Sequence, residues 1–358
     1  MGNTESLLIV NARFLTQPLT GVQRFAVEIS LQLKRLLPNI IFVSPKNILQ
    51  KDIALELNVQ TFGRFTSHLW EQLELPFFLK KEKNAVLLNL CNTAPLFYNR
   101  NIVTIHDIAF QINPQWFSPA FVKLYNFLIP RIAKKSLEVI TVSNCSKQAL
   151  VEYTQIPEEK VNVIYNGISK VFTTLNGEGN KAVPEDFILA VSSIDPRKNF
   201  ISLVKAFKGL NIKGLNLVVV GSESKVFSDT NLKEEIQNCP SIIFTGYLPD
   251  TELATLYRKA KIFVYPSIYE GFGIPPLEAM ASGSPTIVSN TASLPEICGE
   301  ASLYVNPLDV KEIMMRISQL YFDVALQKTL TEKGLKQIQK YSWEKSAKQV
   351  EAVITKYL

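Results

Sequence analysis

The chain has 358 residues, a length expected for about two domains rather than one. Hydrophobic residues make up 47% of it, enough for two cores, yet no apolar run reaches the roughly 18 residues of a membrane-spanning helix. The net charge of +6 is modest and no nucleic-acid recognition motif is present, so we expect no nucleic-acid partner.

Apolar strands alternate with amphipathic helices in the first half of the chain. Strands are predicted near residues 6–14, 40–44, 85–91, 101–106, 138–143 and 161–165. Helices are predicted at residues 21–37, 67–80, 118–136 and 145–153. This alternation is typical of an α/β domain with a parallel sheet, which we place at residues 1–172.

A polar, turn-rich segment at residues 173–186 predicts a linker, after which the alternation restarts. Strands are predicted near residues 187–193, 215–221, 241–246, 261–265, 285–289 and 302–305, and helices near 199–209, 230–238, 250–259 and 275–282. The second domain therefore spans residues 187–342. We predict an α/β protein with two Rossmann-like, doubly wound domains that face each other across a cleft. No G-x-G-x-x-G follows the first strand, which disfavours a dinucleotide dehydrogenase.

Charged side chains follow several of these strands, where open α/β sheets bind ligands. His106 ends the apolar strand at residues 101–105, so we expect its imidazole to point into the cleft. Arg197 and Lys198 follow the strand at residues 187–193 and could neutralise a diphosphate. The alternatives are a structural histidine and two solvated surface cations. Asp250 is predicted to cap the helix that follows Tyr247 and Leu248.

The run from Tyr269 to Met280 carries the most specific chemistry. A buried strand leads into a glycine-rich turn, and Pro275 and Pro276 suit the first positions of a helix whose first turn would hold Glu278. The N–H groups of residues 271–274 would bind an anion at the helix N-terminus. Glu270 and Glu278 would repel that anion, so we expect them to accept hydrogen bonds from sugar and ribose hydroxyls. The alternative is that Glu278 complements the helix dipole and Glu270 is solvated.

Together these residues resemble the retaining glycosyltransferases of family 4. The run from Glu270 to Pro285 is similar to the E-x7-E signature of that family. Other matching pieces are Val142-Ser143-Asn144-Cys145-Ser146, Asn166-Gly167-Ile168, Arg197-Lys198-Asn199 and Gly246-Tyr247-Leu248-Pro249. The resemblance implies the GT-B fold, with an acceptor-side N-terminal domain and a C-terminal helix at residues 343–358 that crosses back to it. The loop Thr20-Gly21-Val22-Gln23-Arg24 departs from the Gly-Gly form of many members.

The resemblance also implies a role for each site residue. Glu278 would bind the ribose, Glu270 the hydroxyls of the donor sugar, and Arg197 and Lys198 the leaving diphosphate. His106 would contact the donor sugar near its reacting carbon. The remaining predicted contacts to the nucleotide sugar are Gly21, Val22, Asn166, Ser193, Tyr247, Leu248, Gly271, Phe272, Gly273 and Ile274.

The predicted function is hexosyl transfer from a nucleotide sugar, UDP-glucose rather than GDP-mannose, to a glycan or lipid-linked glycan in polysaccharide biosynthesis. No Asp-x-Asp occurs in the sequence, so we expect neither a metal nor another cofactor. Two alternatives stay open, a sugar-nucleotide epimerase or hydrolase on the same fold and a non-catalytic nucleotide-sugar-binding scaffold.

The basic charge lies in the first half, where residues 1–172 hold 18 Lys and Arg against 12 Asp and Glu, the whole surplus of six. Its densest pieces are residues 80–83 and 131–135, the latter ending a stretch that contains Phe121, Leu124, Tyr125, Phe127 and Leu128. This stretch could contact an anionic membrane, or it could be a core-facing stripe with a solvated basic face. With four scattered cysteines and no signal pattern, we expect a cytoplasmic protein that could lie at the membrane face.

Overall fold

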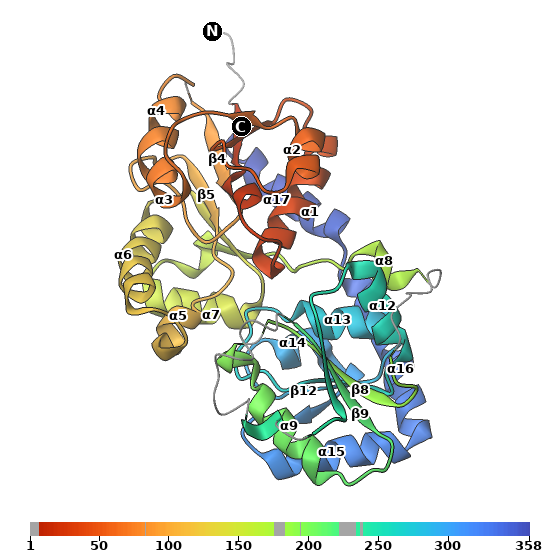
Figure 1. Ribbon diagram of the computed structural model, residues 1–358. Helices are drawn as coiled ribbons and strands as arrows, with labels where there is room; N and C mark the ends of the chain where they lie inside the picture. Colours follow the sequence, from red (N-terminus) through yellow and green to blue (C-terminus); the bar gives the residue numbers. More distant parts are fainter. Residues whose placement is uncertain (1–6, 83, 175–182, 194, 222–233, 237–238) are drawn as a thin grey trace. The chain divides into compact units, whose positions relative to one another are not determined.

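The computed structural model describes residues 7–82, 84–174, 183–193, 195–221, 234–236 and 239–358 (Figure 1). Its contacts divide the chain into two compact units. Unit 1 comprises residues 1–167 and 342–358, and unit 2 comprises residues 168–341. The change of unit after Gly167 leaves residues 168–172, which the sequence analysis placed in the first domain, in unit 2. Residues 175–182 of the predicted linker lie outside the described part of the chain.

Unit 1 is built on a seven-stranded parallel sheet with the order β3-β2-β1-β4-β5-β6-β7. Its strands are β1 (Leu8–Asn11), β2 (Ile41–Ser44), β3 (Gln60–Thr61), β4 (Val86–Asn89), β5 (Asn101–Thr104), β6 (Glu138–Thr141) and β7 (Val161–Val163). The order reverses between β1 and β4, which makes their carboxyl ends the switch point where such sheets bind ligands. The predicted strand at residues 6–14 ends at Asn11, because a 3-10 turn at Arg13–Thr16 follows.

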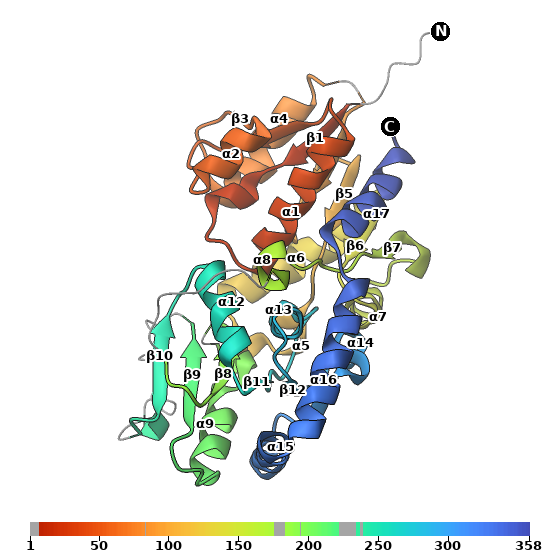
Figure 2. The same ribbon diagram turned by 90° about the vertical axis from the view of Figure 1, so that its right-hand side faces the viewer.

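Helices cover both faces of this sheet. They are α1 (Gly21–Leu36), α2 (Lys51–Leu57), α3 (Ser67–Leu69), α4 (Leu75–Leu79), α5 (Ala109–Ile112), α6 (Pro119–Lys135), α7 (Asn144–Thr154) and α17 (Trp343–Thr355). The predicted helix at residues 67–80 is interrupted by a π-turn at Trp70–Glu74. Figures 1 and 2 show α17 beside α1, and the rings of Phe25 and Trp343 meet there with centroids 6.1 Å apart.

Unit 2 is built on a six-stranded parallel sheet with the order β10-β9-β8-β11-β12-β13. Its strands are β8 (Phe187–Val191), β9 (Asn216–Val220), β10 (Ile242–Gly246), β11 (Ile262–Tyr265), β12 (Thr286–Ser289) and β13 (Ser302–Val305). The strand order reverses between β8 and β11, so their carboxyl ends are the switch point of this unit.

The helices of unit 2 are α8 (Lys170–Thr173), α9 (Phe200–Gly209), α12 (Asp250–Lys259), α13 (Ile274–Ala281), α14 (Leu294–Cys298), α15 (Val310–Phe322) and α16 (Val324–Gln337). Two sequence expectations need correction. Asp250 is the first residue of α12 rather than its cap, since Pro249 holds the cap position. Glu278 is the fifth residue of α13 rather than the fourth and so lies just past the first turn, because the helix already begins at Ile274. Most of the predicted helix at residues 230–238 lies outside the described residues.

The cores explain why the strands were visible in the sequence. In unit 2, Leu217, Val219, Ile262 and Ile287 of the sheet pack with Leu203 of α9 and with α15 in one buried cluster. Strands that helices cover on both faces read as continuous apolar runs. Among the described residues, no helix combines the length and the apolarity needed to cross a bilayer.

Candidate functional site

Two loops of unit 2 meet at its switch point. One follows β8 and contains the 3-10 turn Pro196–Lys198, whose start is capped by Asp195, as its Oδ1 accepts from the N–H of Arg197 at 3.0 Å. The other follows β11 and leads into α13. The N–H of Ile268 donates to the carbonyl of Arg197 at 2.8 Å, and Asn199 Nδ2 donates to the carbonyl of Pro266 at 3.2 Å. These bonds hold the cations beside the acidic run.

Lys198 and Glu270 form a buried ion pair in this place, with 8% and 7% of each residue exposed. Glu270 Oε1 accepts from Lys198 Nζ at 2.5 Å, from Tyr265 OH at 2.9 Å and from Ser267 Oγ at 2.5 Å. Lys198 Nζ also lies 2.8 Å from Tyr265 OH. All three of these partners contact Oε1, and the contact of Glu270 with sugar hydroxyls stays a prediction.

The charges of Lys198 and Glu270 influence each other's pKa. Burial raises the pKa of Glu270, but the positive charges of Lys198 and Arg197 outweigh burial and hold this pKa below its ordinary value. Burial lowers the pKa of Lys198, and Glu270 opposes that shift. Burial leaves the pKa of Lys198 below its ordinary value, and the nearby Glu270 carboxylate favours the charged form of this amine, which lies beside Arg197.

Glu278 has a different partner. It is buried in α13, and its Oε2 accepts a hydrogen bond from Tyr257 OH of α12 at 3.2 Å. Burial first, and then the Glu278 charge, raise the pKa of Tyr257 well above its ordinary value, so the phenol stays protonated and donates. The carboxylate of Glu278 is thus oriented by the protein.

A buried serine, Ser293, holds the turn between β11 and α13 in shape through hydrogen bonds to its backbone. Ser293 Oγ donates to the carbonyls of Glu270 and Phe272, both at 2.9 Å. Gly273 has a φ of +99°, and a Cβ there would lie 2.6 Å from Leu294 Cδ2, so a side chain would strain the backbone and displace Leu294. Gly271 lies inside this turn, and Ile274 begins α13. Phe272 is buried with its ring against Tyr341, centroids 5.8 Å apart. Because Pro275 and Pro276 have no N–H, the first turn of α13 can offer only the N–H groups of Ile274 and Leu277 to an anion.

Three further predicted residues of unit 2 differ in exposure. Ser193, the second residue after β8, is exposed. Tyr247 follows β10 and is 74% exposed, whereas Leu248 is buried. A nucleobase could stack on Tyr247, but Leu248 would have to offer its backbone.

His106 belongs to unit 1 and follows β5. Its Nε2–H donates to the carbonyl of Leu90 at 3.0 Å, because a carbonyl only accepts. Its ring stands perpendicular to Phe25 with centroids 5.0 Å apart. Burial lowers the pKa of His106. The imidazole is therefore neutral, and Nδ1 is the nitrogen able to accept a hydrogen bond. His106 combines structural contacts with an acceptor atom.

The other predicted residues of unit 1 lie at element ends. Gly21 and Val22 open α1. Asn166 is buried, and its Oδ1 finds no hydrogen-bond partner among the described residues. A Cβ on the neighbouring Gly167 would lie 2.2 Å from the backbone nitrogen of Trp343, so α17 requires glycine there.

Sequence reasoning missed a polar cluster at the switch point of unit 1. Glu71 of the π-turn is fully buried and its Oε1 accepts from Arg13 Nε at 3.2 Å and from Asn11 Nδ2 at 3.0 Å. Asn11 also reaches Asn89 at 3.0 Å, and Arg13 reaches Thr93 Oγ1 at 2.9 Å. Asn11, Arg13, Asn89 and Thr93 directly follow or end the apolar runs of β1 and β4, which is the signal that could have found them.

The cations around Glu71 change the pKa of its carboxyl group. Burial raises the pKa of Glu71, but Arg13 and then His68 outweigh burial and bring this pKa to about 2. His68 lies at the edge of the cluster with 29% of its side chain exposed, and its Nδ1 is 3.4 Å from Glu71 Oε2.

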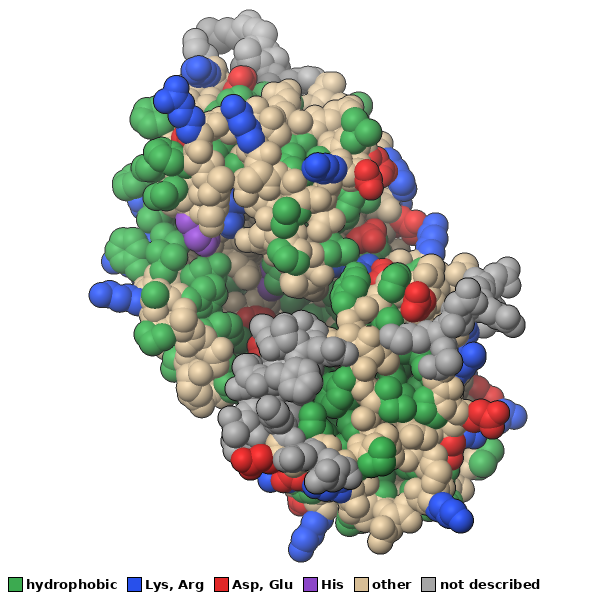
Figure 3. Space-filling model, in the orientation of Figure 1, with side chains coloured by type: hydrophobic (Ala, Val, Ile, Leu, Met, Phe, Trp, Pro, Cys, Tyr) green, Lys and Arg blue, Asp and Glu red, His purple; other side chains and the backbone are tan. Residues whose placement is uncertain are grey.

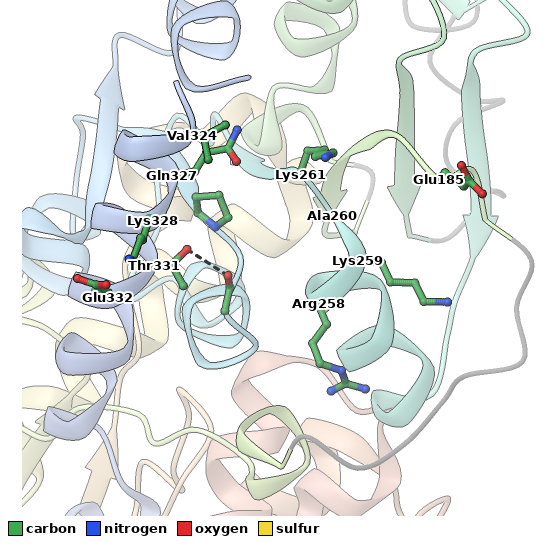
Figure 4. Close-up of a pocket in the computed structure, with 12 residues that line it drawn as sticks. Glu185, Arg258, Lys259, Ala260, Lys261, Val324, Gln327, Lys328, Thr331 and Glu332 are labelled. Atoms are coloured by element: carbon green, nitrogen blue, oxygen red, sulfur yellow. Dashed lines mark hydrogen bonds between the residues drawn. The ribbon is translucent and has the colours of Figure 1, made fainter. Parts of the chain in front are cut away.

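A separate hollow of about 490 Å³ lies in unit 2 (Figure 4). Lys261 and Pro285 in its lining precede β11 and β12, so it lies at the amino ends of these strands, opposite the ligand-binding edge. Figure 4 shows Thr331 of α16 bonded across it, with Oγ1 3.2 Å from the carbonyl of Gly283. None of the predicted site residues lines this hollow.

In the described residues, no three or more His, Cys, Asp or Glu side chains gather closely enough to hold a metal ion. Metal independence remains a prediction.

Known proteins resemble both units. A family model described as Glycosyltransferase Family 4 matches residues 19–170, and one described as Glycosyl transferases group 1 matches residues 172–337. The O-antigen chain mannosyltransferase RfbU of Salmonella typhimurium is 32% identical over 250 residues, 69% of this chain and 68% of RfbU. The serotype-specific mannosyltransferase WbdA of Escherichia coli is 29% identical over 265 residues, 69% of this chain and 32% of WbdA. The chain thus spans about a third of WbdA.

The fold has solved counterparts. The structure of Anabaena Alr3699/HepE in complex with UDP and glucose superposes with a TM-score of 0.75 at 16% identity, covering 98% of this chain and 99% of that one. This likeness concerns the fold alone. Taken with the two family models and the match to RfbU, it leads to one conclusion: the chain belongs to glycosyltransferase family 4 and has the GT-B fold of two Rossmann-like domains.

Proposed function

We propose that the chain transfers a hexose from a nucleotide-diphosphate sugar to a glycan or lipid-linked glycan acceptor in polysaccharide biosynthesis. The observation that carries this proposal is the buried Lys198–Glu270 pair, fixed beside Arg197 and directly before the N-terminus of α13. Two cations and a set of peptide N–H groups together match a diphosphate, and the paired carboxylate matches sugar hydroxyls.

The chemistry follows from where charge develops. When the bond from the anomeric carbon to the diphosphate breaks, negative charge collects on the phosphate oxygens. Arg197, Lys198 and the first turn of α13 would stabilise it in a site held rigid before the reaction. We infer that the acceptor hydroxyl attacks the same face and gives its proton to the leaving phosphate, so that the configuration is retained. His106 Nδ1 would accept a hydrogen bond from the donor sugar.

The donor is the finer part of the proposal. The sequence favoured UDP-glucose over GDP-mannose, but RfbU and WbdA are both named mannosyltransferases. HepE was solved with UDP and glucose, yet it resembles this chain in fold alone. We therefore expect a mannose-bearing donor, and of the two donors considered this is GDP-mannose. The cysteines Cys91, Cys145, Cys239 and Cys298 all lie in the described part of the chain and form no disulfide, which suits the reducing cytoplasm as the proposed location.

A thermal-shift series with GDP, UDP, GDP-mannose and UDP-glucose tests donor binding first. A ligand at about 100 times its dissociation constant adds about 2.7 kcal/mol to the free energy of unfolding. Transfer is then measured with the stabilising donor and a mannose-containing oligosaccharide, and NMR of the new linkage reports its configuration.

Matched variants connect the activity to the site. Lys198→Ala should lower the transfer rate by about 10²–10³-fold, as expected for the loss of one preorganised donor. Lys333→Ala, a partly exposed lysine of α16, should leave it unchanged. Release of free sugar or an epimerised nucleotide without transfer would favour an epimerase or hydrolase. Donor binding without any turnover would favour a scaffold.

A further inference from the structure

One helical segment of unit 1 is apolar on both sides. Trp70, Leu75 and Leu79 face inward and pack in a buried cluster with the sheet. On the outside, Leu69, Leu73 and Phe77 are exposed at intervals of four residues, and Phe77 has 67% of its surface in solvent. An inward apolar stripe suffices for folding, so the outward stripe has another cause.

Two neighbouring segments extend this outward stripe. Phe97, in the loop after β4, is 80% exposed, and Leu124 and Phe127 of α6 are also exposed. Hydrogen bonds join the three segments. Gln72 bonds to the backbone of Ala94 and Leu96, both at 2.9 Å, and Lys135 of α6 bonds to the carbonyl of Leu96 at 3.2 Å. We call this surface the apolar flank, defined by Leu69, Leu73, Phe77, Phe97, Leu124 and Phe127.

Cations lie on the aromatic rings of the apolar flank. Lys80 Nζ is 5.2 Å from the ring centre of Phe77, the Arg131 guanidinium is 3.9 Å from that of Phe127, and Lys135 Nζ is 5.7 Å from that of Phe97. The sequence of α6 contains no acidic residue. Figure 3 shows hydrophobic side chains with lysine and arginine side chains between them on the flank of unit 1.

The structure divides the aromatic stretch from Phe121 to Leu128 into residues that pack on the core and residues that face solvent. Phe121 and Tyr125 stack on each other with centroids 3.9 Å apart and pack with the core, and Leu128 is buried. For these three residues the core-facing interpretation is correct. Leu124 and Phe127 point outward and belong to the apolar flank.

We propose that the apolar flank docks unit 1 onto an anionic lipid bilayer. Interleaved aromatic and cationic side chains suit this occupant, because rings and leucines enter the boundary between headgroups and acyl chains while lysine and arginine meet lipid phosphates. Lysine is depleted from protein interfaces, and two of the three cations on these rings are lysines, which disfavours a protein partner here. This docking goes beyond the proposed transfer reaction and does not depend on it.

Flotation of the full chain with vesicles tests the docking. We expect binding to vesicles of phosphatidylglycerol and phosphatidylcholine, little binding to phosphatidylcholine alone, and weaker binding at high salt. Leu73→Ser with Phe77→Ser should lower the vesicle affinity about tenfold or more. Arg131→Ser with Lys135→Ser should lower it about fivefold per cation removed.

Matched controls come from unit 2. Leu308 and Phe322 are 70% and 68% exposed there, and Leu308→Ser with Phe322→Ser should leave vesicle binding unchanged. Melting temperatures of all variants check that the fold is intact. Three results would overturn the proposal: no binding to anionic vesicles, equal loss in the unit 2 control, or a dimer of the chain in gel filtration that Phe77→Ser dissociates.

Discussion

Glu270 shows what a single side chain does in this fold. Its carboxylate accepts from an ammonium, a phenol and a hydroxyl, and it lies next to the turn that Ser293 shapes. A buried lysine without such a partner would lose its proton or destabilise the fold. Glu270 therefore maintains the charge of Lys198 and is itself held in place to meet a ligand.

Replacing Glu270 by Gln tests this dependence. The change leaves Lys198 buried without a counter-charge, so we expect the free energy of unfolding to fall by about 3–5 kcal/mol. Transfer should fall as well. Urea unfolding at neutral pH measures the loss of stability. The control is Glu300→Gln, which breaks the solvent-exposed pair with Lys333 and should leave the unfolding midpoint almost unchanged. Equal midpoints for the two variants would contradict the prediction.

The pKa of Glu71 predicts an acid-sensitive fold. Its folded value of about 2 lies below the ordinary value of 4.5, so its contribution to stability is complete above about pH 4.5. This contribution, about 3 kcal/mol, is lost as the pH falls from there towards 2. Urea midpoints measured across this range should drop steeply for the native chain and less steeply for Glu71→Gln. If the urea midpoints of the native chain and of Glu71→Gln fall in parallel with pH, Glu71 does not cause the acid sensitivity.

At the scale of elements, strands could be predicted and helix details could not. The strands of both units are apolar because helices cover both faces. Each predicted strand is present, with the predicted bounds for β13 and with shorter ends for the others. The two-residue β3 is exposed, so it carries no apolar signal. The π-turn at Trp70–Glu74 keeps a helix-like pattern, and it turns Glu71 inward where a regular helix was expected. Helices α2, α5, α8, α14, α15 and α16 were not predicted.

The candidate site was predictable in part for the same reason. Loops at the carboxyl ends of strands can be read locally, which brought Arg197, Lys198 and Glu270 into one prediction. The pairing of Lys198 with Glu270 could not be predicted in this way. The two residues are 72 positions apart in the sequence, and their contact depends on the order of the strands in the sheet. The Arg13–Glu71 pair depends in the same way on a contact between distant elements.

The turn before α13 makes an element-scale prediction. Gly273→Ala forces a residue with a Cβ to a φ of +99° and against Leu294, so we expect a loss of stability of about 1–3 kcal/mol and weaker donor binding. Gly214→Ala is the matched control, because Gly214 has a φ of +84° but open space around its Cβ position. The control isolates the backbone strain. If both variants lose the same stability and neither alters donor binding, the close contact with Leu294 does not matter.

At the scale of the whole molecule, both units carry a switch point with polar residues, yet the two sites differ. The site of unit 2 contains adjacent cations and a helix N-terminus, whereas the cluster of unit 1 pairs Arg13 with Glu71. This difference agrees with the proposed assignment of the diphosphate to unit 2.

Metal dependence is a prediction for the complete chain. If Arg197, Lys198 and α13 neutralise the diphosphate, EDTA should leave the transfer rate unchanged, and added Mg²⁺ or Mn²⁺ should not raise it. The measurement is a time course with and without chelator. Loss of turnover in EDTA that Mg²⁺ or Mn²⁺ restores would show that a cation takes part.

Unit 1 is assembled from two separated stretches, residues 1–167 and 342–358, with unit 2 between them. During synthesis every residue of unit 2 therefore leaves the ribosome before α17, the helix that packs against α1. Domains generally fold as units while the chain emerges. Unit 2 can reach its native state first, whereas the first stretch of unit 1 lacks the contact between Phe25 and Trp343 until α17 has been synthesised.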